Sequence, residues 1–384
     1  MNFVPQCAEL AEARQALEWL RAAPSCIHQQ TLRDLEQACR ERGTWKVRWR
    51  SKARWSPSFR FPDRRWLRVE RLGRKWGRVK LPKLGWVRFR WSRPPGGEIH
   101  SATVSRKGAH WFVSLLIDDG REVPEKHAMP NTAVGIDRGV KVAAVTSDGA
   151  FHDREFITAG EAGRYRRLQQ KLARSRRGSA NRRKTITAMG RITSRASDRR
   201  GDFCAFTANR ITGRNAVVVL EDLKIKNMTA SASRTLDEPG ERVAQKRGLN
   251  RSILDKGWSR LGLALANAAR YTGTSVVLVN PAYTSQRCHA CGFVTEGNRE
   301  SQAVFVCKNP GCGHADHADV NAAKNILSAA GHVVPACGDL AVGRSAKQEP
   351  GGRATGRTLR LGISGLHAGE EANCSSACPP SLCL

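Results

Sequence analysis

Residues 281–327 read PAYTSQRCHACGFVTEGNRESQAVFVCKNPGCGHADHADVNAAKNIL, and this stretch sets the architecture of the second half of the chain. It holds four cysteines with the spacing C-x2-C-x15-C-x4-C, at Cys288, Cys291, Cys307 and Cys312. Four thiolates at this spacing are typical of a tetrahedral zinc site, although thiolates alone do not select zinc over another soft metal. Because protein ligands fill all four positions, we predict a zinc ribbon with structural Zn²⁺. The nearby His289, His314 and His317 are then expected to be surface residues.

A helix is predicted directly after the ribbon, and it begins at Asp319. Two more carboxylates end apolar strands: Asp137 follows an apolar strand and Glu221 follows Val-Val-Val-Leu. Each alone has an ordinary explanation as a turn residue, a solvated strand end or a helix cap. Together, on two strands and a helix of a mixed α/β sheet, they match the way RNase H-like folds gather carboxylates around two Mg²⁺ ions.

We therefore predict Asp137, Glu221 and Asp319 as catalytic residues that bind Mg²⁺, with two ions expected. Without metal, three converging carboxylates would repel one another and a phosphate. Two ions could activate a water and stabilise the leaving oxygen during phosphodiester cleavage. Asp316 would add a fourth ligand only if the helix began early.

The net charge indicates the partner. The 384 residues include 65 Lys and Arg against 34 Asp and Glu, which leaves a net charge of +31. This charge is spread along the chain, which favours nucleic acid over the alternative of a membrane surface. The first twenty residues are predicted to form an amphipathic helix and no secretory signal, and no apolar run approaches the roughly 20 residues of a membrane span. The expected location is cytoplasmic, since the cysteine pattern fits a reducing compartment.

The N-terminal third is predicted to combine helices and strands. Residues 9–42 show two helical patterns separated by Pro24, which predicts a helical hairpin. From residue 45 to 91, tryptophan alternates with arginine in short strands with a positive outer face, and further strands at 99–118 are expected to close a small β-barrel. Most of these tryptophans have core packing as their ordinary explanation, while stacking on bases is the functional alternative.

Residues 164–200 are rich in arginine and predicted to be helical, with a break at Gly178. Such a run is usually a solvated face, but on so basic a chain we favour a helix that follows phosphates. The candidate nucleic-acid contacts are Arg166, Arg167, Lys171, Arg174, Arg176, Arg177, Arg182, Arg183 and Lys184.

The predicted organisation follows from these patterns. Residues 1–130 form a basic nucleic-acid-binding region, and residues 131–335 form an RNase H-like α/β domain with the ribbon inserted at 284–316. Residues 336–384 are predicted to be a disordered tail, and its Cys374, Cys378 and Cys383 receive no function.

Four ordered stretches, 135–139, 220–223, 281–288 and 319–326, with the ribbon between the last two, resemble the TnpB (OrfB-type) proteins of insertion sequences. These transposon-encoded RNA-guided nucleases are related to the type V CRISPR effectors. The resemblance spans roughly residues 30–330. It implies a RuvC-like nuclease domain with Asp137, Glu221 and Asp319 as its metal-binding triad.

The resemblance also implies partners: a guide RNA transcribed from the end of the element, and double-stranded target DNA cleaved beside a short motif. One departure is that similar proteins usually begin with an extra strand and helix, so this chain is expected to start inside that region, with guide binding or motif recognition impaired. Two alternatives are a DDE-type transposase, which would not require the ribbon, and a non-catalytic nucleic-acid-binding regulator derived from such a nuclease.

Overall fold

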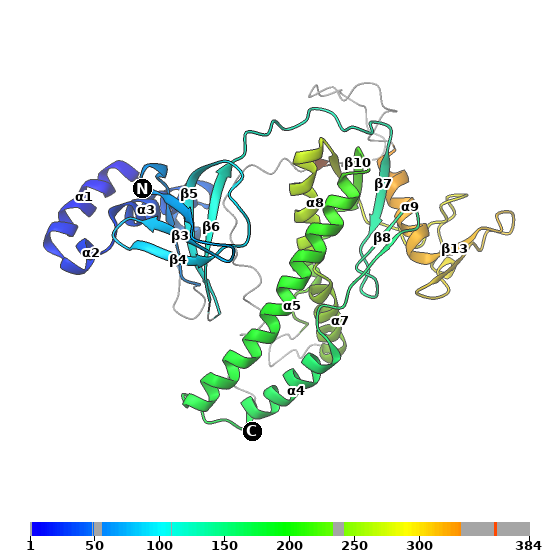
Figure 1. Ribbon diagram of the computed structural model, residues 1–384. Coiled ribbons are helices and arrows are strands. Elements are labelled where there is room, and N and C mark those ends of the chain that lie inside the picture. The colour runs from blue at the N-terminus through cyan, green and yellow to red at the C-terminus, as the bar shows by residue number, and fades with distance from the viewer. Residues whose placement is uncertain are drawn as a thin grey trace. The chain divides into compact units, whose positions relative to one another are not determined.

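The computed structural model describes residues 2–47, 49, 56–108, 110–232 and 242–331, together with a short strand at Arg357–Thr358 (Figure 1). The described residues form two compact units that divide between Glu122 and Val123. The predicted tail at 336–384, with its three cysteines, otherwise lies outside the described residues. The division of the chain into a nucleic-acid-binding region and a nuclease domain stays a prediction.

The first unit begins with three helices. These are α1 (Phe3–Ala16), α2 (Glu18–Ala22) and α3 (Ser25–Arg42), followed by the short 3-10 helices η1 (Thr44–Lys46) and η2 (Arg64–Trp66). Pro24 stands directly before α3, where proline favours an extended backbone and a helix start. Leu17 is also extended and separates α1 from α2, so the predicted two-helix hairpin is not confirmed.

The strands of the first unit form two separate sheets. One sheet has the order β1 (Ser58–Phe61), β5 (Glu98–Lys107) and β6 (His110–Asp118); the other has β2 (Arg68–Arg71), β3 (Trp76–Leu81) and β4 (Gly85–Arg90). All neighbouring strands are antiparallel. Phe61 and Ala102 from the first sheet share one core with Val79 and Leu81 from the second. The predicted strands are present, but the hydrogen bonds of the described strands do not close the single barrel that we expected.

The second unit is built on one mixed sheet. Its order is β14 (Arg357–Thr358), β11 (Ser275–Val279), β10 (Val217–Glu221), β7 (Ala133–Asp137), β8 (Ala144–Thr146) and β9 (Phe151–His152). Strands β7, β10 and β11 are parallel, while β8, β9 and β14 pair antiparallel to their neighbours. The predicted hairpin of β7 and β8, the strand at 275–279 and the mixed α/β class agree with this sheet.

Helices cover both faces of the sheet. Helices α5 (Ala180–Thr212) and α8 (Trp258–Thr272) cover one face and α9 (Ala318–Ala330) the other. The unit also contains α4 (Ala159–Ala173), α6 (Ile225–Met228) and α7 (Val243–Lys256). Successive strand residues point to opposite faces, so Val218 and Leu220 join a core with α5 and α8. Val217 and Val219 instead join a second core with α9, on the other side of the sheet (Figure 1).

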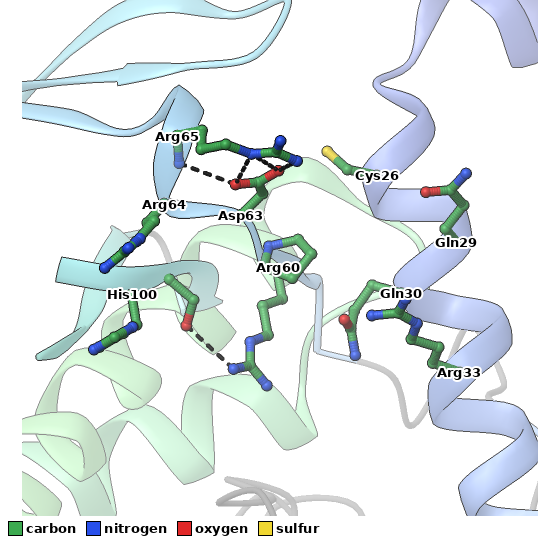
Figure 2. A pocket seen from close by; sticks show the side chains of 11 residues that line it. Cys26, Gln29, Gln30, Arg33, Arg60, Asp63, Arg64, Arg65 and His100 are labelled. Atoms are coloured by element: carbon green, nitrogen blue, oxygen red, sulfur yellow. Dashed lines mark hydrogen bonds and ion pairs between the residues drawn. The ribbon is translucent and has the colours of Figure 1, made fainter. Parts of the chain in front are cut away.

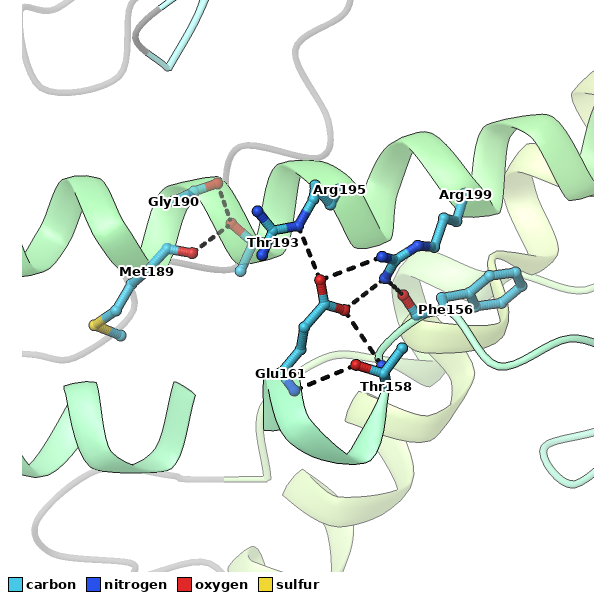
Figure 3. A network of polar contacts seen from close by, with 8 residues as sticks. All are labelled: Phe156, Thr158, Glu161, Met189, Gly190, Thr193, Arg195 and Arg199. Atoms are coloured by element: carbon cyan, nitrogen blue, oxygen red, sulfur yellow. Dashed lines mark hydrogen bonds and ion pairs between the residues drawn. The ribbon is translucent and has the colours of Figure 1, made fainter. Parts of the chain in front are cut away.

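Glu161 fastens α4 to the long helix α5 (Figure 3). Its carboxylate accepts hydrogen bonds from Arg195 at 2.8 Å and from Arg199, while Thr158 and Glu161 form a capping box at the start of α4. The Arg199 guanidinium and these other donors hold the pKa of Glu161 at about 2. The predicted break is present, since Gly178 lies between α4 and α5 with φ at 79°.

Among the helices of the described residues, none is long and apolar enough to cross a membrane.

Helix α9 approaches β7 so closely that only glycine fits at position 135. A Cβ atom on Gly135 would lie 2.2 Å from the Ala323 carbonyl oxygen and 2.7 Å from the Leu327 nitrogen. These are backbone atoms of α9, which cannot rotate away as a flexible side chain can. The helix backbone therefore rests directly on the strand.

We expect Gly135→Ala to destabilise the second unit by about 1–3 kcal/mol, because it forces α9 off the sheet. The measurement is the urea midpoint together with hydrogen exchange of the α9 amides. Gly190→Ala is the matched control, since a Cβ there meets nothing within 4 Å and alanine favours the helix. Equal α9 exchange in both variants would contradict this packing.

Candidate functional site

Two of the predicted catalytic residues stand side by side at the carboxyl ends of parallel strands. Leu220 of β10 is in register with Ile136 of β7, so the next residues, Glu221 and Asp137, are neighbours. Asp137 lies two residues after Gly135 and Glu221 two residues after Val219, so both belong to the face that α9 covers.

The third predicted residue comes from α9 itself. Asp319 lies in the first turn of this helix, one turn before Ala323, whose carbonyl oxygen faces Gly135. The ring of His317 caps the helix by accepting a hydrogen bond from the Asp319 backbone N–H at 3.2 Å. Two strand ends and one helix start therefore bring Asp137, Glu221 and Asp319 to the same edge of the sheet.

These carboxylates influence one another electrostatically. The exposed fractions are 8% for Glu221 and 5% for Asp319. Burial, together with the negative charges of Glu221 and Asp319, raises the pKa of Asp137 to about 7. Burial also raises the pKa of Glu221. A cluster of oxygen ligands with unfavourable mutual repulsion fits a divalent cation such as Mg²⁺, which would remove that repulsion.

Two arginines that sequence analysis did not select also reach this edge. Arg299, from the ribbon, pairs with a carboxylate oxygen of Asp319 at 2.7 Å. Arg138 is buried and donates from Nη2 to the Glu221 carbonyl oxygen at 2.6 Å, while its Nε has no partner in the described part of the chain. The carboxylates are thus accompanied by positive charge supplied from two different segments.

A threonine fixes the orientation of Glu221. The Thr284 hydroxyl donates to Oε1 of Glu221 at 2.7 Å, and it follows Tyr283, which has a positive φ of 63° in a tight turn. Asn325 on α9 donates to the carbonyl oxygens of Thr284 at 2.9 Å and Arg287 at 2.7 Å. Helix α9 therefore positions the segment that orients Glu221.

The asparagines of the helix motif also anchor the ribbon. One turn before Asn325, Asn321 accepts from the His289 backbone N–H at 3.0 Å and donates to the Arg287 carbonyl at 2.8 Å. Both asparagines are buried, so these bonds satisfy polar groups that burial would otherwise penalise. Their role explains the two asparagines of the sequence Asp-Val-Asn-Ala-Ala-Lys-Asn.

The four predicted zinc ligands converge. One sulfur pair, Cys288 and Cys312, is 3.8 Å apart and the other, Cys291 and Cys307, is 3.6 Å apart; all four sulfurs lie within 4.8 Å of one another. Tetrahedral Zn–S bonds of about 2.3 Å would place sulfurs roughly 3.8 Å apart. Without a metal the sulfurs differ, because a backbone N–H of Phe293 lowers the pKa of Cys291 to about 6 while burial raises the pKa of Cys307 to about 12. The donor set therefore fits zinc.

The ribbon around these sulfurs is held by turns and by a buried amide. It contains the 3-10 helix η3 (Glu296–Asn298) and the strands β12 (Val304–Val306) and β13 (Ala315–His317). Gly292 and Gly313 have positive φ directly after knuckle cysteines, where an L side chain would be strained. Asn298 donates to the Gln286 carbonyl at 2.9 Å and accepts from the Lys308 N–H at 2.8 Å, which links the two knuckles.

The residues named near the ribbon have other partners. Asp316 belongs to β13, before α9, and pairs with Lys324 at 2.7 Å, so the early helix start that would have made it a fourth ligand is absent. Besides capping α9, His317 packs edge to face on Phe151, with ring centroids 4.9 Å apart. His289 is exposed, as expected, while His314 is half-buried.

The predicted nucleic-acid contacts lie on α4, on α5 and between them. Eight of the nine are exposed: Arg166, Arg167, Lys171, Arg174, Arg176, Arg177, Arg183 and Lys184. Arg182 is half-buried and donates to the carbonyl oxygens of Leu172 at 2.8 Å and Ser175 at 3.3 Å, at the end of α4. Contact of these residues with phosphates stays a prediction. Arg182 also has a structural role, because it binds carbonyl oxygens at the end of α4.

Comparison with known families gives two matches. Residues 117–232 match the family described as "Probable transposase", and residues 258–326 match "Cas12f1-like, TNB domain". The first match contains β7, β10 and their carboxylates, and the second contains the ribbon and the start of α9.

Curated relatives cover most of the chain. The Escherichia coli protein "Putative RNA-guided DNA endonuclease InsQ" is 38% identical over 348 residues, which are 89% of this chain and 84% of that protein. A Streptomyces pristinaespiralis protein named "Putative RNA-guided DNA endonuclease" is 33% identical over 71% of this chain and 65% of its own length.

A solved structure titled "Cryo-EM structure of the Cas12f1-sgRNA-target DNA complex" aligns with a TM-score of 0.40 at 17% identity, over 71% of this chain and 59% of that one. The 38% identity to the Escherichia coli protein, over 89% of this chain, is sufficient to identify the family. The chain belongs to the TnpB (OrfB-type) family of transposon-encoded RNA-guided nucleases.

Proposed function

We propose that this protein is a Mg²⁺-dependent, RNA-guided DNA endonuclease of an insertion sequence, with a RuvC-like catalytic domain. The observation that carries the proposal is the convergence of Asp137, Glu221 and Asp319, where burial and the charges of the other two carboxylates raise the pKa of Asp137. Family membership supports the guide RNA and the double-stranded DNA target as partners. Sequence would then be read mainly by base pairing, while the protein recognises duplex shape.

In this mechanism the three carboxylates would hold Mg²⁺. When bound, divalent ions supply charge neutralisation and Lewis acidity for attack of water on the phosphodiester. Glu221 is kept in place by Thr284, so one of its oxygens is already engaged and the other stays available as a ligand. Arg299 places a positive charge beside Asp319, where it can stabilise charge that develops on the phosphate.

The cysteine ribbon has a structural role in this proposal. Zn²⁺ held by Cys288, Cys291, Cys307 and Cys312 would use all four positions and leave none for a water. Its task is to fold the loop that carries Arg299 and to keep the Thr284 segment against α9. The exposed basic residues of α4 and α5 are proposed to contact nucleic-acid phosphates.

We expect Asp137→Ala to reduce guided DNA cleavage by about 100-fold or more, because it removes a ligand of the catalytic metal. The assay compares cleavage of a plasmid target by the RNA-loaded protein with and without Mg²⁺. Asp202→Asn is the control, since this carboxylate is exposed on α5 and pairs with Arg154. If wild type and Asp137→Ala both bind target without cutting it, the chain is a non-catalytic regulator.

The raised pKa of Asp137 predicts a pH dependence of stability in magnesium-free buffer. Because the folded value of about 7 exceeds the ordinary 3.8, the native state binds a proton that the unfolded chain releases between these values. This contribution is complete below the ordinary pKa and is lost as pH rises through about 7. The native carboxyl is charged at higher pH, where its burial is unfavourable.

The Asp137→Asn side chain carries no charge at any of these pH values. The free energy of unfolding of this variant minus that of wild type should therefore rise by on the order of 2 kcal/mol from about pH 5 to about pH 8. Urea unfolding of both proteins at several pH values measures this difference. Added Mg²⁺ should reduce it at high pH, because the ion stabilises only the wild type. A difference that is constant with pH would refute the coupling.

We expect Cys288→Ser to lower bound zinc below one ion per chain and to weaken protection of the α9 amides, because the metal and the ribbon fold together. Elemental analysis and hydrogen exchange are the readouts. Cys7→Ser, in α1 of the first unit, should leave both unchanged. Full zinc content in the Cys288 variant would show that the ribbon does not need this ligand.

A further inference from the structure

Arg138 is a cation buried directly behind the candidate site. It follows Asp137 at the end of β7, and only 7% of it is exposed. Asp137 lies on the sheet face that α9 covers, so Arg138 extends to the opposite face. Val134 and Ile136 of the same strand pack against α5 and α8 there. The guanidinium reaches α8, because a Cβ atom on Gly262 would lie 3.7 Å from its Nη1.

Burial of this charge is unfavourable unless other groups compensate for it. Burial lowers the pKa of Arg138, while the negative charges of Glu221, Asp137 and Asp222 raise it. Within the described part of the chain, its one hydrogen bond goes to a backbone carbonyl and not to a carboxylate. Its Nε has no acceptor there. A methionine would fill similar space without a charge, so packing alone does not account for the arginine.

The hydrogen bond of Arg138 joins the ends of two strands. The paired register of β10 and β7 ends at Leu220 and Ile136, while the Asp222 N–H still bonds to β11. Backbone groups of successive strand residues point to alternate sides, so the Glu221 carbonyl faces the β7 side. Nη2 of Arg138 donates to this carbonyl oxygen at 2.6 Å. The side chain therefore continues the cross-strand bonding beyond the last paired residues.

The turn that follows Arg138 is fixed by helix α8. The indole N–H of Trp258 donates to the Gly139 carbonyl oxygen at 3.0 Å, and Trp258 is buried. A Cβ atom on Gly139 would lie 2.8 Å from the Val142 carbonyl oxygen, so the chain turns tightly there. The backbone is thus held on both sides of Arg138, by the strand before it and by this turn after it.

The arginines of the first unit show a more usual arrangement. A hollow of about 550 Å³ between α3 and β1 contains Arg33, Arg60, Arg64 and Arg65 (Figure 2). All four are exposed, and their partners are side chains, in the same order the Phe3 ring, the Ser101 hydroxyl and the carboxylates of Glu98 and Asp63. Arg138 has neither this exposure nor such a partner among the described residues. Its place beside the carboxylates requires another reason.

We propose that Arg138 is a positioning residue that fixes the separation of the Asp137 and Glu221 carboxylates by binding the Glu221 main chain. The bond ties the end of β10 to the residue that follows Asp137, so one side chain links both strand ends. Thr284 holds the Glu221 carboxylate, and Arg138 holds its backbone. Ligands held in this way are preorganised for a cation. The inference rests on the proposed nuclease function and adds how its metal ligands are kept in place.

Two possible roles of Arg138 predict opposite effects on cation binding. A guanidinium that acted only through its charge would repel a divalent cation, so its removal would strengthen metal binding. A guanidinium that positions the ligands keeps them together, so its removal weakens metal binding. The direction of the change in the uncharged variant Arg138→Met therefore separates the two roles.

The test titrates Mn²⁺ into the full zinc-loaded chain without RNA and follows the free ion by electron paramagnetic resonance. We expect Arg138→Met to weaken binding at the carboxylates about 10-fold or more, as for other groups that orient metal ligands. Asp137→Ala shows which part of the binding belongs to the carboxylates. Tighter or unchanged binding in Arg138→Met would overturn the proposal.

Arg260→Met is the matched control. Arg260 lies on α8, is half-buried and donates to the Ser197 carbonyl oxygen at 2.6 Å, so the substitution removes a similar bond away from the carboxylates. It should bind Mn²⁺ as wild type does, and equal weakening in this control would overturn the proposal. Urea unfolding checks that the variants fold. If Arg138→Met does not fold, Arg138→Lys decides, since lysine keeps the charge but lacks the planar donor fork, and wild-type affinity would then refute the role.

The outcome can be separated from that of the nuclease proposal, because metal binding is measured without cleavage. Weakened Mn²⁺ binding in both Asp137→Ala and Arg138→Met, without guided cleavage by wild type, would refute the nuclease and leave the positioning role. Guided cleavage that requires Asp137, with unchanged Mn²⁺ affinity in Arg138→Met, would refute the positioning role and leave the nuclease.

Discussion

The contact between the backbone of α9 and β7 at Gly135 is the constraint on which the candidate site depends. Because no side chain separates helix from strand there, the first turn of α9 is held beside the carboxyl ends of β7 and β10. That placement brings Asp319 to Asp137 and Glu221, and it lets Asn321 and Asn325 hold the segment that follows β11. The contact at Gly135 therefore positions the three carboxylates, Thr284 and the first residues of the ribbon.

Electrostatics and packing oppose one another at this edge. The sheet and α9 bury Glu221 and Asp319 beside the half-buried Asp137, and the mutual repulsion of these carboxylates is unfavourable for the protein alone. Arg299 and Arg138 offset part of this repulsion. The valine-rich cores on both faces of the sheet supply the stability that lets such a cluster persist. A site of this kind is prepared for a cation before any cation binds.

Sequence reasoning succeeded where the signal is local. Carboxylates that end apolar strands, four cysteines at ligand spacing and a glycine that interrupts a basic helix each predicted features that the structure contains. It failed where a feature depends on distant partners. No local sequence pattern predicts that Arg299 pairs with Asp319 or that Thr284 donates to Glu221. The separation of the N-terminal strands into two sheets has no local signal either. Leu17 ends α1 without proline or glycine, so that break had no signal either.

The two ends of the ribbon meet at the same place. At its start, the Thr284 carbonyl accepts from Asn325 and the His289 N–H bonds to Asn321; both asparagines lie on α9, which begins directly after the ribbon ends. An insertion whose ends are already close adds little loop-closure entropy when its length changes. During evolution this module could therefore lengthen, shorten or be exchanged while its anchor points stayed fixed, which makes it the natural position for grafting in protein engineering.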